Sequence, residues 1–283
     1  MRIAIIGTGN MGGAILRGLI KAAACHPEEF VCTAKSEATK NKLREYNDAI
    51  RVVDDNAAAV AEADIIVLAV KPWLVDEVME EIRPALDLKR QIIVSVAAGV
   101  TLRELVNFAV PEYDIIEANR ICAEISGNEP EAFDEPVIFR VIPNTAVEAL
   151  CGVSLIAHHG ASDEQVEQVK GLFSALGYAL VVDEKMLSAG TALASCGIAF
   201  AMRYIRAAME GGVELGFRPE EAARLVEHTV KGAATLLLES GVHPEVEIDK
   251  VTTAGGITIK GLNAMERSGF SAAVIDGLKA SKV

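Results

Sequence analysis

Two glycine-bearing segments have residue types and spacing that suit anion binding, and the first lies near the N-terminus. Gly7-Thr8-Gly9-Asn10-Met11-Gly12 follows the apolar run 3–6 and precedes a helix-forming stretch. In this G-x-G-x-x-G pattern, the first glycine allows a tight turn and the second lets the backbone approach a pyrophosphate. The third lets the helix pack on the strand. The N–H groups at the helix start then face the phosphates. The segment predicts a dinucleotide site; the alternative is a glycine-rich turn without a ligand.

The second segment, residues 252–258, lies just before the last predicted helix. Gly255 and Gly256 allow the backbone to curl, so the hydroxyls of Thr253 and Thr258 and several N–H groups can converge near a helix start. Such a nest is of a size to bind a carboxylate group. The alternative interpretation is an N-cap loop without a ligand.

The tip of the second predicted strand is expected to meet the adenine ribose of the dinucleotide. Proteins that prefer NAD place Asp or Glu there to accept a hydrogen bond from the ribose 2′-hydroxyl. Here Lys35 and Ser36 stand at the tip and could serve a 2′-phosphate. We therefore expect NADP to be preferred over NAD. Glu37, one step further on, leaves NADH use open, and Lys35 could instead be a solvated loop charge.

Further candidates follow other predicted strands, because ligands of parallel sheets bind at the carboxyl ends of the strands. Lys71 and Pro72 follow the nearly continuous apolar run 64–70, which is typical of a strand covered on both faces. Their alternative role is a polar strand end before a helix-starting proline. Together with Lys71 and Pro72, the candidate cofactor residues beyond the glycine segment and the strand tip are Asn56, Ala69, Val70, Ala97, Ala98, Gly99 and Asn144.

The alternation of strand and helix patterns predicts an α/β fold with an N-terminal Rossmann-type, doubly wound parallel sheet. The predicted strands are 3–6, 30–34, 50–53, 64–70, 91–96, a strand within 140–145, 153–157 and 178–182. The predicted helices are 10–23, 36–46, 57–63, 75–86, one opened by the capping box at 101–104, and 162–176, opened by the capping box at 162–165.

The composition shifts at Glu184, after which no strand pattern remains. Three segments, 185–215, 219–239 and 259–280, are predicted helices, and alanine and glycine recur in the first two. Small side chains permit close backbone approach, which suits self-association. We expect a dinucleotide-binding domain at 1–183 and an all-helical dimerisation and substrate domain at 184–283, in a homodimer or a larger homo-oligomer built from dimers.

Composition restricts the partners and the compartment. The net charge of −13 argues against a nucleic-acid partner. Five scattered cysteines without a C-x-x-C spacing, and no signal peptide before the first strand, predict a cytoplasmic protein with reduced thiols. His158-His159 has no visible third ligand, so we expect a solvated strand end and no metal site.

Two unusual segments remain. The acid-rich stretch 111–136 is predicted to be a surface insertion with a short helix. The uncharged stretch 186–202 is at the short end for a membrane span and contains serine, threonine and glycine, which favours a helix buried in a soluble interface.

The chain resembles the pyrroline-5-carboxylate reductase family over nearly its whole length. The stretches that carry the resemblance are 7–12, 70–72, 95–99, 140–145, 251–258, 269–270 and 273–275. The resemblance implies a Rossmann domain that binds NAD(P)H and a helical domain that intertwines with a partner subunit. It also implies that the segment 252–258 holds the substrate carboxylate beside the partner's cofactor. The residues concerned are Thr253, Gly255, Gly256, Ile257 and Thr258.

The implied reaction is hydride transfer from NADPH to the C=N carbon of 1-pyrroline-5-carboxylate, giving L-proline. A protonated imine is already electrophilic, so positioning would supply most of the catalysis, with Thr258 as the candidate catalytic residue. One alternative is a related reductase of the β-hydroxyacid dehydrogenase type, but those enzymes use a lysine that 190–202 does not offer. Another is a non-catalytic nucleotide-sensing protein, supported by departures from the family pattern at Ala254, Ile257 and 194–200.

Overall fold

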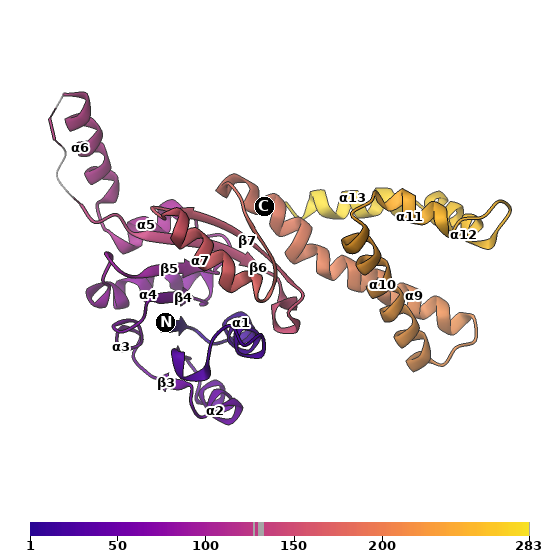
Figure 1. Ribbon diagram of the computed structural model, residues 1–283, viewed down its shortest axis with the longest axis horizontal. Helices are drawn as coiled ribbons and strands as arrows, with labels where there is room; N and C mark the ends of the chain where they lie inside the picture. The colour runs from indigo at the N-terminus through magenta and orange to yellow at the C-terminus, as the bar shows by residue number, and fades with distance from the viewer. Residues whose placement is uncertain (127, 130–132, 283) are drawn as a thin grey trace. The chain divides into compact units, whose positions relative to one another are not determined.

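The computed structural model describes residues 1–126, 128–129 and 133–282. Parts of the predicted insertion, at 127 and 130–132, and the C-terminal residue of the predicted second domain lie outside the described residues. The chain divides into two compact units, Met1–Gly190 and Thr191–Val283. Figure 1 gives the order of the elements along the chain.

The first unit is built on an eight-stranded sheet in the order β3-β2-β1-β4-β5-β6-β7-β8. Strands β1 to β6 are parallel, in the order typical of dinucleotide-binding folds. The predicted Rossmann-type α/β fold is therefore confirmed. The strands are β1 (Ile3–Ile6), β2 (Phe30–Thr33), β3 (Arg51–Val53), β4 (Ile65–Leu68), β5 (Ile92–Ser95), β6 (Val137–Pro143), β7 (Gly152–His159) and β8 (Gly177–Val181).

The last two strands differ from the predicted all-parallel sheet, because β7 runs antiparallel to β6. Only residues 144–151 connect them, including the 3₁₀ turn η4 (Thr145–Ala149). A parallel return needs a crossover of about a dozen residues or more. The short connection therefore forces a reversal, and β8 then pairs parallel to β7.

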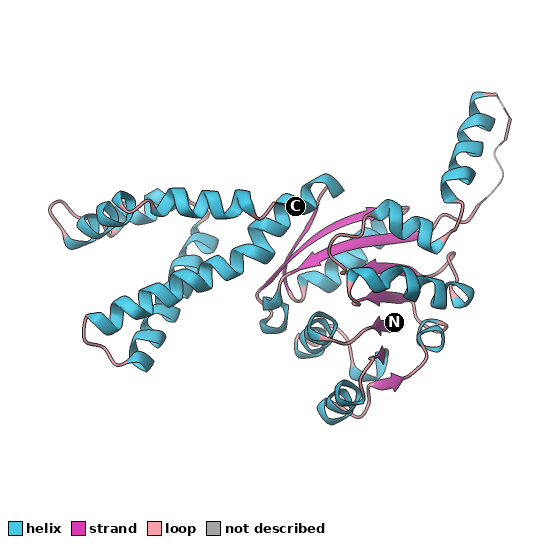
Figure 2. Cartoon of the chain, turned by 180° about the vertical axis from the view of Figure 1, so that it is seen from behind, coloured by secondary structure: helices cyan, strands magenta, loops and turns pink. Residues whose placement is uncertain are grey.

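Helices cover both faces of the sheet (Figure 2), which explains the apolar strand runs. Alternate residues of β1 enter opposite cores: Ala4 and Ile6 pack with α3, α4 and α5, whereas Ile3 and Ile5 pack with α1, α2 and α7. The helices of this unit are α1 (Asn10–Lys21), α2 (Glu37–Tyr46), α3 (Asn56–Val60), α4 (Val75–Ile82), α5 (Leu102–Ala109), α6 (Tyr113–Ile125), α7 (Asp163–Ser174) and α8 (Leu187–Gly190). Both predicted capping boxes are present, at the starts of α5 and α7.

The stretch 111–136 is tied to the sheet rather than lying wholly on the surface. Tyr113, the first residue of α6, is 1% exposed. Its hydroxyl donates to Glu135 at 2.8 Å, and Glu135 lies 3.0 Å from His159 Nε2. The predicted strand end at His158-His159 is present, since β7 ends at His159 and His158 is exposed, but the His159 ring is half-buried and contacts Glu135 instead of solvent alone.

The second unit is helical, as predicted, but the bounds of its helices differ from those predicted. It contains the π-helical turn η6 (Thr191–Cys196), α9 (Gly197–Glu214), α10 (Pro219–Ser240), α11 (Pro244–Lys250), α12 (Ile257–Arg267) and α13 (Phe270–Ala280). The short helix α11 was not predicted. The predicted helix 259–280 is two helices, because Gly269 adopts a φ of +80° that ends the helical path.

One copy of the second unit lacks a hydrophobic core of its own. Among its described residues only Ala192 and Ala222 are buried, and a Cβ on Gly212 of α9 would lie 3.0 Å from the Ala222 Cβ of α10. Large apolar side chains remain accessible, including Leu225 at 52% and Leu238 at 86%. The helical segment Glu184–Glu214 is also long and apolar enough, by length and composition, to cross a membrane.

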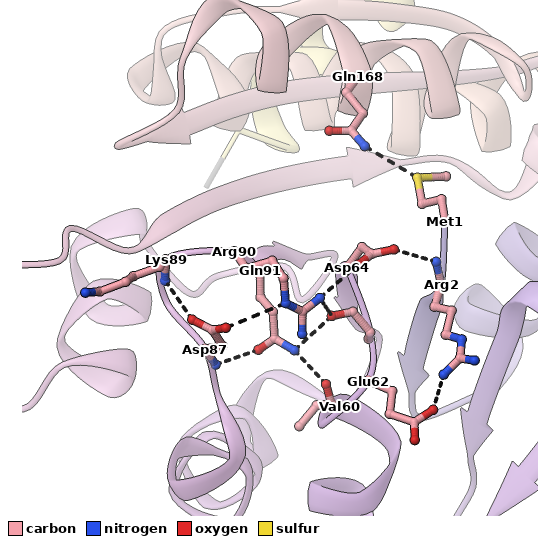
Figure 3. Close-up of polar contacts among 11 residues, drawn as sticks. Met1, Arg2, Val60, Glu62, Asp64, Asp87, Lys89, Arg90, Gln91 and Gln168 are labelled. Atoms are coloured by element: carbon pink, nitrogen blue, oxygen red, sulfur yellow. Dashed lines mark hydrogen bonds and ion pairs between the residues drawn. The ribbon is translucent and has the colours of Figure 1, made fainter.

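A polar network joins the amino ends of β1, β4 and β5 (Figure 3). Asp64 accepts from the backbone N–H of Arg2 and from Arg90, each at 2.8 Å. Gln91, 1% exposed, accepts from Asp87 N and donates to the carbonyls of Val60 and Ala63. The network ties the strand starts together at the sheet end opposite the candidate ligand residues.

Gln91→Leu is expected to lower the free energy of unfolding by about 2–4 kcal/mol, because three hydrogen bonds are lost and the Asp87 N–H loses its acceptor. Urea unfolding of the full chain measures this. The matched control is Gln168→Leu, since Gln168 is exposed and contacts only the Met1 sulfur among the interactions described. Equal stabilities of the two variants would contradict the structural role assigned to Gln91.

Candidate functional site

The glycine loop after β1 is held in place by the end of β2. The Thr33 carbonyl accepts from Gly7 N at 3.2 Å, from Thr8 N at 2.9 Å and from the Thr8 hydroxyl at 2.8 Å. Thr8 is 2% exposed, so these bonds are shielded from water. Thr33 was not among the predicted site residues, because nothing in its local sequence distinguishes it from other strand residues.

Each glycine of the loop meets a different steric demand. Gly7 has a φ of +89°, and a Cβ there would lie 2.7 Å from Val70 Cγ1. A Cβ on Gly12 would lie 2.6 Å from the Gly7 carbonyl oxygen, so close packing of α1 on the loop requires glycine. A Cβ on Gly9 would meet nothing within 4 Å. The space above Gly9 is therefore open to a ligand.

The start of α1 has the features of an anion site. Gly9 is its N-cap and supplies no side chain to cap the helix. The N–H groups of Asn10, Met11 and Gly12 have no carbonyl partner within the helix, since the first turn of any α-helix leaves its donors unpaired. Together with the helix dipole they can bind phosphate oxygens.

The other candidate cofactor residues of this unit lie at the same carboxyl edge of the sheet. Ala69 and Val70 follow β4 and pack against Gly12 and Gly7, respectively. Lys71 is exposed at the end of β4, and Ala98 and Gly99 are exposed after β5, with a φ of +89° at Gly99. The structure thus brings together the ends of β1, β4 and β5 as predicted from the order of the motifs.

Asn144 lies at the end of β6 but is already engaged in the fold. Its side chain is buried, and its Oδ1 accepts from the backbone N–H groups of Ala146 and Val153, each at 3.2 Å. It thereby caps η4 and secures the reversal into β7. Pro72 begins the 3₁₀ turn η2 (Pro72–Leu74), and Ala97 is buried.

Lys35 and Ser36 are exposed beyond the end of β2. The Ser36 hydroxyl is the N-cap of α2 and accepts from Thr39 N at 3.2 Å. Asn56 is the first residue of α3, and its amide donates to Glu81 at 2.8 Å. Lys35 is thus the candidate at this end whose charge is most open to an incoming anion.

The second candidate segment lies in the second unit, between α11 and α12. Gly255 has a φ of +71°, and a Cβ on Gly256 would lie 2.6 Å from Thr253 Oγ1, so both glycines are needed for the loop's path. Gly256 N donates to the Thr253 carbonyl at 2.9 Å. Thr258 is the second residue of α12, whose N-cap Gly256 offers no side-chain acceptor. Ile257 is 87% exposed at the head of the helix.

The geometry of this loop is compatible with the anion nest that the sequence predicts. Within the described part of the chain, no hydrogen-bond partner occupies the Thr253 or Thr258 hydroxyl, whereas the neighbouring Thr252 hydroxyl donates to the Ile248 carbonyl at 2.6 Å. Two hydroxyls and the unpaired N–H groups of the first helical turn remain for a carboxylate.

The two buried cysteines are poor candidates for nucleophiles. Burial raises the pKa of the Cys32 thiol to about 12 and that of Cys25 to about 11, so both stay protonated at neutral pH. No group of three or more His, Cys, Asp or Glu side chains that could hold a metal ion occurs among the described residues.

Comparison with known proteins identifies both parts of the chain. Residues 184–283 match the family model for pyrroline-5-carboxylate reductase dimerisation, and residues 2–99 match a model described as NADP oxidoreductase, coenzyme F420-dependent. The first part is thus of a pyridine-nucleotide oxidoreductase type.

Curated relatives align over almost the entire chain. Pyrroline-5-carboxylate reductase 1 of Dictyostelium discoideum is 34% identical over 99% of this chain, although the chain spans only 48% of that relative. The reductase of Methanosarcina acetivorans is 33% identical over 98% of this chain and 94% of its own length. A solved pyrroline-5-carboxylate reductase from Coxiella burnetii is 26% identical, with a TM-score of 0.84 over 99% of this chain and 95% of that one. The fold, the full-length similarity and the dimerisation match together place this chain in the pyrroline-5-carboxylate reductase family.

Proposed function

We propose that the chain reduces 1-pyrroline-5-carboxylate to L-proline, with NADPH as the preferred hydride donor. The observation that carries the proposal is full-length similarity to reductases of this name, and it is supported by a glycine loop before an uncapped helix start in each unit. The absence of lysine between residues 190 and 202 argues against the β-hydroxyacid dehydrogenase alternative.

In the proposed site, the start of α1 holds the pyrophosphate and Lys35 and Ser36 meet the 2′-phosphate. Asn56 would contact the adenosine part of the cofactor. The turns at Ala69–Pro72 and Ala97–Gly99, together with Asn144, surround the nicotinamide. The bound cofactor supplies the hydride, and the protein orients it toward the imine carbon.

The substrate is proposed to bind through its carboxylate at residues Thr253, Gly255, Gly256, Ile257 and Thr258. The hydroxyl and N–H of Thr258 would donate to the carboxylate and fix the ring relative to the hydride. The protonated imine needs no strong enzymic base to be reduced. A domain boundary near 183/184 would place this loop on the dimerisation domain.

Assembly as a homodimer, or as an oligomer of dimers, would supply the core that one copy of the second unit lacks. The accessible apolar side chains of α9 and α10 would then be covered by a partner, rather than by lipid. All five cysteines are free thiols, which supports a cytoplasmic location. Because these helices need a partner, the folded enzyme is expected to be an obligate dimer.

Leu225→Asp in α10 should therefore shift the protein to dissociated, inactive species, because a buried unpaired charge is strongly unfavourable at a packed interface. Sedimentation velocity at assay concentration, combined with activity, measures this. Ile125→Asp is the matched control, since Ile125 is 81% exposed on α6 of the first unit. Finding an active wild-type monomer would refute the obligate dimer.

Lys35→Asp should weaken NADPH binding at least about tenfold while leaving NADH binding nearly unchanged, since a hydrogen bond to a charged group contributes about 1.5–3 kcal/mol. Quenching of tryptophan emission can follow both titrations, because Trp73, the one tryptophan in the sequence, adjoins the proposed nicotinamide turn. Lys89→Asp, at the opposite end of the sheet, is the control. An equal change for both nucleotides would argue against a 2′-phosphate at Lys35.

Adding 1-pyrroline-5-carboxylate to the protein and NADPH should oxidise NADPH and produce L-proline, which a nucleotide sensor would not do. Thr258→Val should lower kcat/KM for the imine about 10- to 100-fold through loss of one donor to a carboxylate. NADPH affinity should hardly change. Thr252→Val is the control, because the Thr252 hydroxyl already donates a hydrogen bond to the Ile248 carbonyl. Normal kinetics with a lowered thermal midpoint would show that Thr258 only stabilises the helix start.

A further inference from the structure

Lys40 is a covered lysine at the adenosine end of the candidate cofactor site. It lies on α2 and is only 8% exposed. Its ammonium contacts Glu37 Oε1 at 2.7 Å and forms an ion pair with Asp54. The hydrogen bonds that Lys40 donates to Asp54 and Glu37 raise the pKa of Lys40, and the bond from Lys40 lowers the pKa of Asp54. Both shifts favour the charged forms of Lys40 and Asp54, and Lys40 lies between the two carboxylates.

The sheet register places this cluster beside Lys35 and Ser36. Val53 at the end of β3 pairs with Thr33 at the end of β2, and Asp54 follows directly. Glu37 is the residue after Ser36 and opens α2. The side chains of Glu37 and Asp54 are 71% and 81% exposed, whereas that of Lys40 is 10% exposed. Two accessible carboxylates therefore lie next to the expected ribose 2′ position, and both are paired with a covered cation.

The charge balance at this end depends on Lys40. Four charged side chains are connected there: Lys40 pairs with Glu37 and Asp54, and Arg44 lies 3.8 Å from Glu37. The formal charges of these four side chains sum to zero. Without Lys40 the sum is −1, which opposes a phosphate group carrying about −1.5 to −2 charges. A released Glu37 would also be the type of acceptor that a ribose 2′-hydroxyl prefers.

We propose that Lys40 is a specificity-determining positioning residue: by pairing with Glu37 and Asp54, it keeps both carboxylates from the ribose 2′ position and so favours NADPH over NADH. This inference rests on the proposed dinucleotide function. It assigns the cofactor preference to a covered ion-pair cluster as well as to the exposed Lys35.

Dissociation constants for NADPH and NADH, and for adenosine 2′,5′-bisphosphate and AMP, test the proposal on the full-length protein. Lys40→Met should weaken NADPH and the bisphosphate about tenfold, an effect typical of one charge contact, while NADH and AMP bind as before or more tightly. Lys40→Arg should restore the wild-type preference. Circular dichroism and the urea midpoint confirm that each variant is folded.

A double-mutant comparison distinguishes an indirect from a direct role. In a Glu37→Gln, Asp54→Asn background, Lys40→Met should change the NADPH-to-NADH preference less than threefold, because no carboxylate remains to be released. A tenfold loss of NADPH affinity in that background would mean that Lys40 contacts the phosphate itself, and would overturn the proposal. An unchanged preference in the single variant would also overturn it. If wild-type protein binds neither nucleotide, the proposed function fails as well.

Discussion

The candidate cofactor site depends on the hydrogen bonds that the Thr33 carbonyl accepts. Three donors from Gly7 and Thr8 converge on this one buried acceptor, so the loop after β1 is fixed to the end of β2. The position of the α1 N-terminus follows from this anchor, because Gly12 packs directly over the Gly7 carbonyl. Backbone contacts between neighbouring parallel strands therefore aim the helix dipole and its unpaired donors at one point.

Around this point, an acidic protein can bind an anionic cofactor through local electrostatics. The net charge of −13 is unfavourable at long range, but solvent and salt screen distant charges. Unpaired N–H groups at the starts of α1 and α12 lie at the proposed binding sites, where short distances leave less room for screening. At the adenosine end, Lys40 neutralises the acids nearest the expected phosphate. Binding thus depends on pairing among neighbours more than on total charge.

The two units obtain their stability in different ways. The first has two cores, one on each face of its sheet, and a polar network that joins the starts of its strands. The second leaves nearly all of its apolar side chains accessible in one copy. The match to a dimerisation domain is consistent with this exposure, because a second chain can cover apolar helix faces. The threonine–glycine loop lies on this second unit, the part of the chain that matches the dimerisation domain.

The sequence by itself determined the features that depend on neighbouring residues. The glycine turn, the capping boxes, the buried parallel strands and the helical second half follow from periodicity and from conformations that only glycine or capping side chains favour. Tertiary structure alone decided the features that join distant segments. Among these are the Thr33 anchor, the reversal of β7, the seating of His159 against Glu135 and Tyr113, and the pairing of Lys40 with Asp54. The split of the last predicted helix at Gly269 was missed because glycine is compatible with both a helix interior and a helix end. Long-range pairing leaves no periodic signal, since each partner residue is ordinary within its own segment and becomes distinctive only when the fold brings the two together.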